Sequence, residues 1–179
     1  MKSLANWVSM LRIGFIPLVL YFLLADFFLM AAVFICVSAF SDILDGYLAR
    51  RFHQVTKLGI LLDPIADKLM MMVVAAFFVT LRELPVWYVL ILFYKDFSLL
   101  TGMFALLFYQ KEAIVSSQAV GKLSAALNFM LLFFICLSQV TVTTRFVIHP
   151  LLILSSVFIV LSFLSYSKRW FGLFGGAVE

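Results

Sequence analysis

Residues 147–166 have the sequence VIHPLLILSSVFIVLSFLSY, which contains no Asp, Glu, Lys or Arg. An α-helix needs about 20 predominantly apolar residues to cross the hydrocarbon core of a bilayer. This stretch meets that requirement and predicts a membrane-spanning helix. The rest of the chain has a similar character, because the 179 residues are 65% hydrophobic and only 12% charged.

This composition excludes several classes of protein. A soluble domain is about 45–50% apolar and about 25% charged, and a globule of this length has too little interior to bury the excess apolar surface. A soluble enzyme, a disordered chain and a nucleic-acid-binding domain are therefore excluded, and nucleic acid is not expected as a partner. Cys36 and Cys136 both lie in apolar runs and are expected to be free thiols.

Five further apolar runs precede residues 147–166, and polar residues or turns separate them. We therefore predict an all-α, polytopic membrane protein with six transmembrane helices, formed as a single domain over residues 1–179. The predicted spans are Trp7–Ala25, Phe28–Ala49, Gly59–Leu81, Val86–Tyr109, Gly121–Val142 and Val147–Tyr166.

The basic residues predict the orientation of this bundle, because cytoplasmic loops carry an excess of Lys and Arg. Six spans place both termini on one side of the membrane. The basic residues on that side are Lys2, Arg12, Arg50, Arg51, Lys57, Lys111, Lys122, Lys168 and Arg169, whereas Arg82 and Arg145 fall on the other side. We therefore expect both termini to be cytoplasmic, with membrane lipids around the bundle.

Four aspartates lie at the ends of neighbouring apolar runs. Asp42 and Asp45 close the second predicted span, and Asp63 and Asp67 open the third. An Asp costs about 2.5–3.5 kcal/mol at the centre of a membrane helix, so a chain that carries four of them must offset the cost. Water, salt bridges or bound cations are the possible sources of that offset.

Helical spacing brings these acids together. Asp42 and Asp45 share one sector of the second predicted helix with Arg50, while Asp63 and Asp67 are four residues apart and form a stripe on the third. The link between the two helices is short, so we expect them to be antiparallel neighbours whose acidic stripes face each other near the cytoplasmic end.

A cluster of carboxylates without thiolate or imidazole suits Mg²⁺, Mn²⁺ or Ca²⁺ rather than zinc. Four carboxylates can hold two such ions, and paired ions clamp a phosphate or pyrophosphate. The alternative is a structural cluster in which Arg50, Arg51 and Lys68 neutralise the acids. Small residues on the same stripes, Gly46, Ala49 and Gly59, either leave room for a ligand or let the two helices pack closely.

The pattern Asp42-x2-Asp45-Gly46-x2-Ala49-Arg50-x8-Gly59-x3-Asp63-x3-Asp67 resembles the signature of the CDP-alcohol phosphotransferase family at every specified position. The start of the chain, Asn6-x2-Ser9-x2-Arg12-x4-Pro17, is similar to the bacterial phosphatidylglycerophosphate synthase branch of that family. The resemblance therefore covers nearly the whole chain.

The resemblance implies an enzyme of glycerophospholipid biosynthesis that transfers a phosphatidyl group from CDP-diacylglycerol to an alcohol and releases CMP. It implies that two Mg²⁺ or Mn²⁺ ions are held by Asp42, Asp45, Asp63 and Asp67, with Asp67 also acting as the catalytic base. The CDP-lipid pocket would be shaped by Gly46, Ala49, Arg50 and Gly59. A homodimer in the bacterial inner membrane, with its active site facing the cytoplasm, is also implied.

The candidate acceptor ligands are Lys95 in the fourth predicted span and Lys122 at the start of the fifth. The branch implies glycerol 3-phosphate as the acceptor, but it carries an Arg-Glu pair and G-K-x-K-T in these regions. Here the corresponding residues are Lys95-Asp96 and Gly121-Lys122-Leu123-Ser124. This loss of cations leaves phosphatidylglycerol, the acceptor of the cardiolipin synthase branch, as the alternative. If they do not bind the acceptor, Lys95 is expected to be a buried partner for a nearby acid, and Lys122 is expected to anchor the chain on the positive side of the membrane.

Two other hypotheses lie outside catalysis. A cation transporter or channel would use the acidic stripes as an ion path, but such a path should continue across the bilayer, and these acids cluster at one end. A non-catalytic membrane scaffold gives no reason for an intact signature.

Overall fold

The computed structural model of the chain is an all-helical bundle. It describes the backbone of residues 4–51, 57–108, 119–141 and 145–175, and the side-chain surroundings of residues 14–40, 65, 68–102, 119–141 and 146–168. Those parts of the chain contain helices and turns but no strand. The helices are α1 (Leu4–Leu24), α2 (Phe28–Arg51), α3 (Lys57–Thr80), α4 (Val86–Phe108), α5 (Ala119–Ser138) and α6 (Arg145–Gly175).

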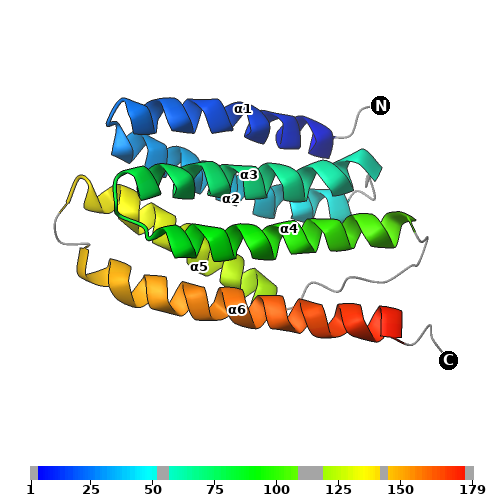
Figure 1. Cartoon of the computed structure of the whole chain (residues 1–179). Coiled ribbons are helices and arrows are strands. Elements are labelled where there is room, and N and C mark those ends of the chain that lie inside the picture. Colours follow the sequence, from blue (N-terminus) through cyan, green and yellow to red (C-terminus); the bar gives the residue numbers. More distant parts are fainter. Residues whose placement is uncertain (1–3, 52–56, 109–118, 142–144, 176–179) are drawn as a thin grey trace.

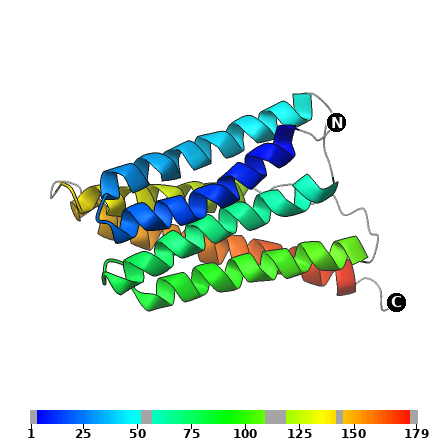
Figure 2. The same ribbon diagram turned by 90° about the horizontal axis from the view of Figure 1, so that it is seen from above.

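Successive helices alternate in direction along the bundle (Figures 1 and 2). The first turns of α1 and α3 and the last turns of α2, α4 and α6 lie toward one end, which we call the Leu4 end, whereas α5 begins short of that end, beside α6. The turns at 25–27 and 81–85 lie at the opposite end, which we call the Arg82 end. Residues at the end of α2 and the start of α3 therefore share one end of the molecule.

Helix packing arranges the bundle around a shared apolar core. α1 packs against both α2 and α3, and lies between them when viewed from above (Figure 2). α5 packs against α2, α3 and α6, and α4 packs against α3 and α6. The largest fully buried side chains are Tyr88, Phe78, Leu23, Ile35, Met70, Leu92, Leu131, Leu132, Ile135 and Ile159.

The two turns at the Arg82 end are built in the same way. Asp26 and Arg82 have φ angles of 61° and 60°, in the left-handed region. In the first turn the Phe27 amide donates to the Phe22 carbonyl at 2.8 Å, and in the second the Glu83 amide donates to the Phe78 carbonyl at 3.0 Å. These are Schellman caps, which satisfy the last helical carbonyls and reverse the chain in a few residues.

The six predicted apolar runs are confirmed as helices, and two of their boundaries differ from the prediction by four residues or more. α5 ends at Ser138 rather than Val142, because the amides of residues 139–141 turn back onto the carbonyls of Cys136 and Leu137. α6 continues to Gly175, past the predicted end at Tyr166. The prediction is based only on the apolar stretch. Backbone hydrogen bonds can continue a helix through polar residues, so the helix extends beyond that stretch.

The surface of the bundle is strongly apolar. Phe146 is 73% exposed, Leu24 68% and Phe40 67%, and many other large apolar side chains are exposed along the helices. Soluble monomers rarely expose contiguous apolar surface on this scale. Within the described residues, Ala119–Ser138 and Phe146–Lys168 are long and apolar enough to cross a membrane. These features indicate a membrane protein, and the six spans and their orientation stay predictions.

Candidate functional site

The predicted metal-binding and CDP-binding residues lie on the backbone of two helices at the Leu4 end. Asp42, Asp45, Gly46, Ala49 and Arg50 belong to the last turns of α2, and Gly59, Asp63 and Asp67 to the first turns of α3. Both helices pack against α1 and against α5. The fold therefore brings the two halves of the signature to one end of the bundle.

The side chains of these eight residues lie outside the part of the chain whose side-chain surroundings are described. Among the described residues no group of three or more His, Cys, Asp or Glu side chains is placed to hold a metal ion. α2 and α3 are antiparallel as expected, but over the parts of the chain that the structure describes they do not pack extensively against each other, because α1 lies between them (Figure 2). The expectation that their acidic stripes face each other at the Leu4 end stays a prediction. Their chemistry fits a hard divalent cation, because the acidic residues of the signature offer only carboxylate oxygen.

Two lysines and one aspartate meet inside the bundle beside the signature. Lys68 of α3 donates to Asp96 Oδ1 of α4 at 2.7 Å, and Lys95 Nζ lies 3.3 Å from the same oxygen. The side chains of Lys95 and Asp96 are each 7% exposed, and that of Lys68 is 20% exposed. Lys68 directly follows Asp67, so this ion-pair cluster adjoins the predicted catalytic base along α3.

The charge of this cluster follows from its members. Two ammonium groups and one carboxylate give Lys68, Lys95 and Asp96 a net charge of +1. Burying such charges is costly unless they are paired and hydrogen-bonded, and the shared Asp96 oxygen supplies that pairing. The prediction of Lys95 as a partner for a nearby acid is confirmed, while its role as an acceptor ligand stays a prediction. Sequence reasoning missed the pairing of Lys68 with Asp96, although both interrupt apolar runs.

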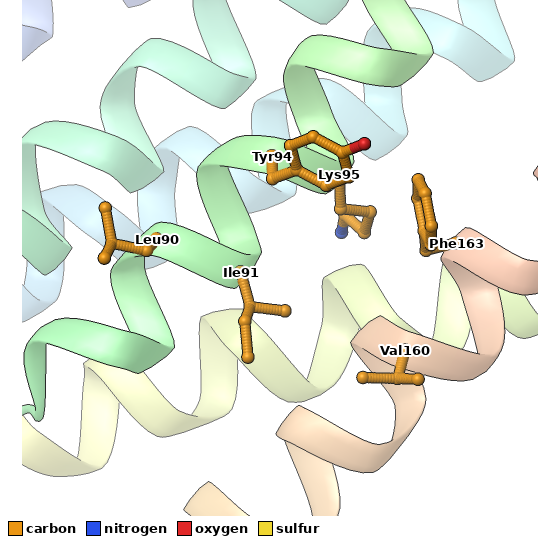
Figure 3. A pocket seen from close by; sticks show the side chains of 6 residues that line it. All are labelled: Leu90, Ile91, Tyr94, Lys95, Val160 and Phe163. Atoms are coloured by element: carbon orange, nitrogen blue, oxygen red, sulfur yellow. The ribbon is translucent and has the colours of Figure 1, made fainter.

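Lys95 also lines a groove between α4 and α6 (Figure 3). The groove has a volume of about 220 Å³, and its lining residues are Leu90, Ile91, Tyr94, Lys95, Val160 and Phe163. The rings of Tyr94 and Phe163 lie 5.3 Å apart and join the two helices. The groove therefore connects an apolar surface with a buried ammonium group, an arrangement that suits a ligand with both apolar and anionic parts.

Lys122 lies in the first turn of α5 and is exposed. Its neighbour Gly121 lies close to Tyr166 of α6, since a Cβ built on Gly121 would lie only 2.7 Å from the Tyr166 hydroxyl oxygen. Gly121 thus permits a close contact between α6 and the first turn of α5, which carries Lys122.

A buried polar network joins α4, α5 and α6 further into the bundle. The Tyr88 hydroxyl lies 2.7 Å from Asn128 Oδ1, to which it donates, and 3.1 Å from Ser155 Oγ. All three residues are at most 3% exposed. Buried polar groups of this kind are normally satisfied by such partners, so the network sets the register of the three helices around Lys95.

Comparisons with known proteins agree with the signature. A model of the family described as CDP-alcohol phosphatidyltransferase matches residues 2–164. A Bacillus subtilis CDP-diacylglycerol–glycerol-3-phosphate 3-phosphatidyltransferase is 29% identical over 138 residues, covering 69% of this chain and 70% of the relative. A Mycobacterium bovis putative cardiolipin synthase is 36% identical over 129 residues, covering 72% of this chain and 61% of the relative.

A Streptomyces coelicolor cardiolipin synthase (CMP-forming) is also similar, with 36% identity over 104 residues. That alignment covers 55% of this chain and 48% of the relative. The matches thus span from about half to seven tenths of these relatives' lengths. One kind of relative is named for glycerol 3-phosphate and the other for the synthesis of cardiolipin, and both are similar to this chain.

Proposed function

We propose that this chain, which belongs to the CDP-alcohol phosphatidyltransferase family, transfers a phosphatidyl group from CDP-diacylglycerol to an alcohol and releases CMP. The observation that carries the proposal is the placement of the whole signature on the last turns of α2 and the first turns of α3, at one end of the bundle. A signature split between distant parts of the fold would not support a single reaction centre.

The proposed ligands of two Mg²⁺ or Mn²⁺ ions are Asp42, Asp45, Asp63 and Asp67. When bound, such ions would supply positive charge for the phosphate oxygens and the leaving CMP. Gly46, Ala49 and Gly59 leave room for the CDP group, and Arg50 binds a phosphate.

Asp67 accepts the proton of the attacking hydroxyl, because a neutral alcohol needs a base within hydrogen-bond reach. The hydroxyl oxygen forms a bond to the lipid-side phosphorus of CDP-diacylglycerol. The bond from that phosphorus to the bridging oxygen of the pyrophosphate breaks, and CMP leaves with that oxygen.

The proposed acceptor is glycerol 3-phosphate, in line with the similarity to the Bacillus subtilis enzyme. Lys95 and Lys122 are the proposed acceptor ligands. A second candidate, phosphatidylglycerol, is favoured by a specific observation. Lys95 and Lys68 share the carboxylate of Asp96, which neutralises part of their positive charge and suits a singly charged phosphodiester better than a nearly dianionic phosphate monoester.

We further propose that residues 1–179 form one membrane domain with six spans, cytoplasmic termini and a cytoplasm-facing site in a bacterial inner membrane, and that the chain works as a homodimer. The apolar exposed surface supports the spans. The placement of Arg50, Arg51 and Lys57 at the Leu4 end, opposite Arg82, supports the orientation under the positive-inside rule.

The test is an assay of the purified chain in detergent micelles with labelled CDP-diacylglycerol. Each acceptor is supplied in turn with Mg²⁺ or Mn²⁺, and CMP and the lipid product are followed. We expect CMP only when a divalent ion and an acceptor are both present, and its loss on chelation with EDTA. If CMP is released only when phosphatidylglycerol is supplied, then phosphatidylglycerol rather than glycerol 3-phosphate is the acceptor. If no alcohol leads to CMP release, the proposed transferase activity is contradicted. The cation-transporter hypothesis would then be tested by measuring ion flux.

A further inference from the structure

A second cavity lies at the Arg82 end of the bundle, away from the signature. It has a volume of about 440 Å³ and lies between the turn that joins α3 to α4 and the first two turns of α6. Its lining includes Arg82, Glu83, Val86, His149 and Leu152. None of these residues has a part in the proposed transfer reaction, so this cavity, which we call the Arg82 cleft, needs a separate explanation.

Two side chains of the Arg82 cleft can donate hydrogen bonds to an anion. Arg82 and His149 both line the cleft and are both exposed. A guanidinium group presents its N–H donors in a geometry that matches phosphate, and an imidazole can donate one more hydrogen bond. The cleft also adjoins the first turns of α4 and α6, where the helix dipole favours negative charge. Glu83 lines the cleft too, which disfavours a dianion and makes a singly charged phosphodiester the better match.

The Arg82 cleft and the apolar groove of Figure 3 follow one another along the same seam between α4 and α6. Both helices begin at the Arg82 end and run in the same direction (Figure 1). On α4, Val86 of the cleft and Leu90 and Tyr94 of the groove succeed each other every four residues, so they fall within about 80° of one helix face. On α6, His149 of the cleft and Val160 of the groove are eleven residues apart and differ by only about 20°.

The length of this seam matches one leaflet of a bilayer. From His149 to Val160, α6 rises about 16 Å at about 1.5 Å per residue, and the hydrocarbon of one leaflet is about 15 Å thick, half of about 30 Å. The Tyr88 hydroxyl, 3.1 Å from Ser155 Oγ, holds the two helices together between the cleft and the groove. Trp87, which is 47% exposed at the start of α4, is typical of a membrane–water interface. A headgroup in the cleft and an acyl chain in the groove would therefore lie at their usual depths.

The groove opens onto the apolar surface of the bundle. Leu90 and Tyr94 are each 62% exposed, and Val160 is 43% exposed. The ammonium group of Lys95, which also lines the groove, lies 3.3 Å from Asp96 Oδ1. An acyl chain in such a groove has protein atoms on more than one side, so it gains more dispersion contacts than a chain on a flat helix surface.

We propose that the seam between α4 and α6 binds a glycerophospholipid from the leaflet at the Arg82 end. Its phosphodiester accepts hydrogen bonds from Arg82 and His149 in the cleft, and one acyl chain lies in the groove. This site is at the end of the bundle opposite the signature, so its lipid is not a substrate of the proposed transfer and instead holds α4 against α6. The inference rests on the membrane character of the bundle and is independent of the proposed function.

The test is photo-cross-linking of the purified chain in maltoside micelles, which contain no phosphate. The probe is phosphatidylethanolamine with a diazirine in one acyl chain, at a mole fraction below saturation, because this lipid is neither the donor nor a proposed acceptor. We expect Leu90 and Tyr94 to be labelled several-fold more than Val33 and Val37. These valines are 49% and 44% exposed on α2 and lie about as far from the start of their helix. Equal labelling of the two pairs would overturn the proposal, because lipid anywhere on the apolar surface would give that result.

Two variants test the two parts of the site. Arg82→Gln should lower the labelling of Leu90 about tenfold, which is the loss of a hydrogen bond between charged groups, and Val160→Trp should lower it by filling the groove. Lys168→Gln is the control for the lost cation, because Lys168 is exposed near the opposite end of the bundle. Val157→Trp is the control for the added ring, because Val157 is 49% exposed on α6 and does not line the groove. Labelling that Arg82→Gln and Val160→Trp leave as high as the controls do would refute the site.

A probe without phosphate tests the role of the cleft. Diacylglycerol with the same diazirine-bearing chain should label Leu90 no more than Val33, because the acyl chain alone lacks the contacts with Arg82 and His149. Labelling of Leu90 by this probe as strong as that by the phospholipid would show that the cleft binds no phosphodiester, and would overturn the proposal.

A second copy of the chain is the competing occupant of the seam. The molar mass of the protein in the same micelles, measured by light scattering, distinguishes the two. If Val160→Trp halves the molar mass while the phospholipid probe leaves the groove of the unmodified chain unlabelled, the seam is an interface between copies and the lipid site is refuted. An unchanged molar mass, with reduced labelling, supports the lipid site.

The cross-linking requires no turnover, so its outcome is separate from that of the proposed function. If the unmodified chain releases no CMP, labelling of the groove that depends on Arg82 still supports the lipid site. If CMP is released, Arg82→Gln is expected to release it at an unchanged rate, whereas loss of activity together with unchanged labelling would contradict the assignment of Arg82 to this lipid.

Discussion

The Lys68 ammonium of α3 donates a 2.7 Å hydrogen bond to the Asp96 carboxylate of α4, inside an otherwise apolar bundle. This bond joins the helix that carries the second half of the signature to the helix that carries Lys95. Lys95 lies 3.3 Å from the same carboxylate oxygen, so one acid holds two cations. The position of Lys95, a proposed acceptor ligand, is thereby tied to the helix of the proposed base.

Removing the charge of Asp96 should destabilise the protein. Asp96→Asn leaves the buried Lys95 and the partly buried Lys68 without their shared counter-charge, and breaking a buried ion pair costs about 3–5 kcal/mol. The melting temperature in detergent should fall markedly. Asp26→Asn is the matched control, because Asp26 is exposed in a turn with φ 61° and Asn tolerates that conformation. Similar melting temperatures for the two variants would show that the Asp96 pairs contribute little.

Gly121→Ala should strain the contact between α5 and α6. The new methyl group would meet the Tyr166 hydroxyl oxygen at 2.7 Å, and overpacking of this kind costs about 1–3 kcal/mol. In a Tyr166→Phe background the nearest ring atoms are 3.4 and 3.5 Å away, so the same substitution should cost less. Thermal unfolding of the four proteins of this double-mutant cycle measures the coupling.

Gly14→Ala is the control for the glycine substitution, since a Cβ there meets nothing within 4 Å. We expect it to stabilise α1 by about 0.5–1 kcal/mol, the helix propensity gained over glycine. A loss of stability at Gly14 as large as that at Gly121 would mean that steric contact is not the cause.

Tyr88→Phe should weaken the packing of α4 against α5 and α6. The substitution removes the hydroxyl that donates to Asn128 at 2.7 Å and contacts Ser155 at 3.1 Å. Leaving a buried amide oxygen without that donor costs about 1–3 kcal/mol. Tyr21→Phe, at a position 61% exposed, should change stability by less than about 0.5 kcal/mol. Equal unfolding free energies for both variants would argue against the network.

Asp67→Asn and Asp63→Asn should differ in how strongly they reduce turnover and CDP-lipid binding. If Asp67 is the base, Asp67→Asn should lower kcat by about 10²–10⁴-fold and weaken CDP-lipid binding less than Asp63→Asn does. CMP release and titration with a labelled CDP-lipid measure the two effects separately. Equal loss of binding in both variants would remove the assignment of Asp67 as the base.

The helices followed from local properties of the chain. Apolar runs of the length of residues 147–166 form helices because every backbone group must be satisfied within the membrane, and polar residues mark where the runs end. The signature was likewise visible, since Asp42 to Asp67 lie close in sequence and their spacing fixes their helical faces. The ends of α5 and α6 were less predictable, because hydrogen bonds at a helix terminus do not depend on hydropathy.

Contacts between distant residues required the folded chain. Lys68 and Asp96 belong to different helices, and so do Tyr88, Asn128 and Ser155, so their pairing depends on how the helices rotate and slide against one another. The close contact between Gly121 and the Tyr166 hydroxyl also joins residues far apart in the chain, and the energy of such packing depends on shapes that meet in space rather than on the order of residues along the chain.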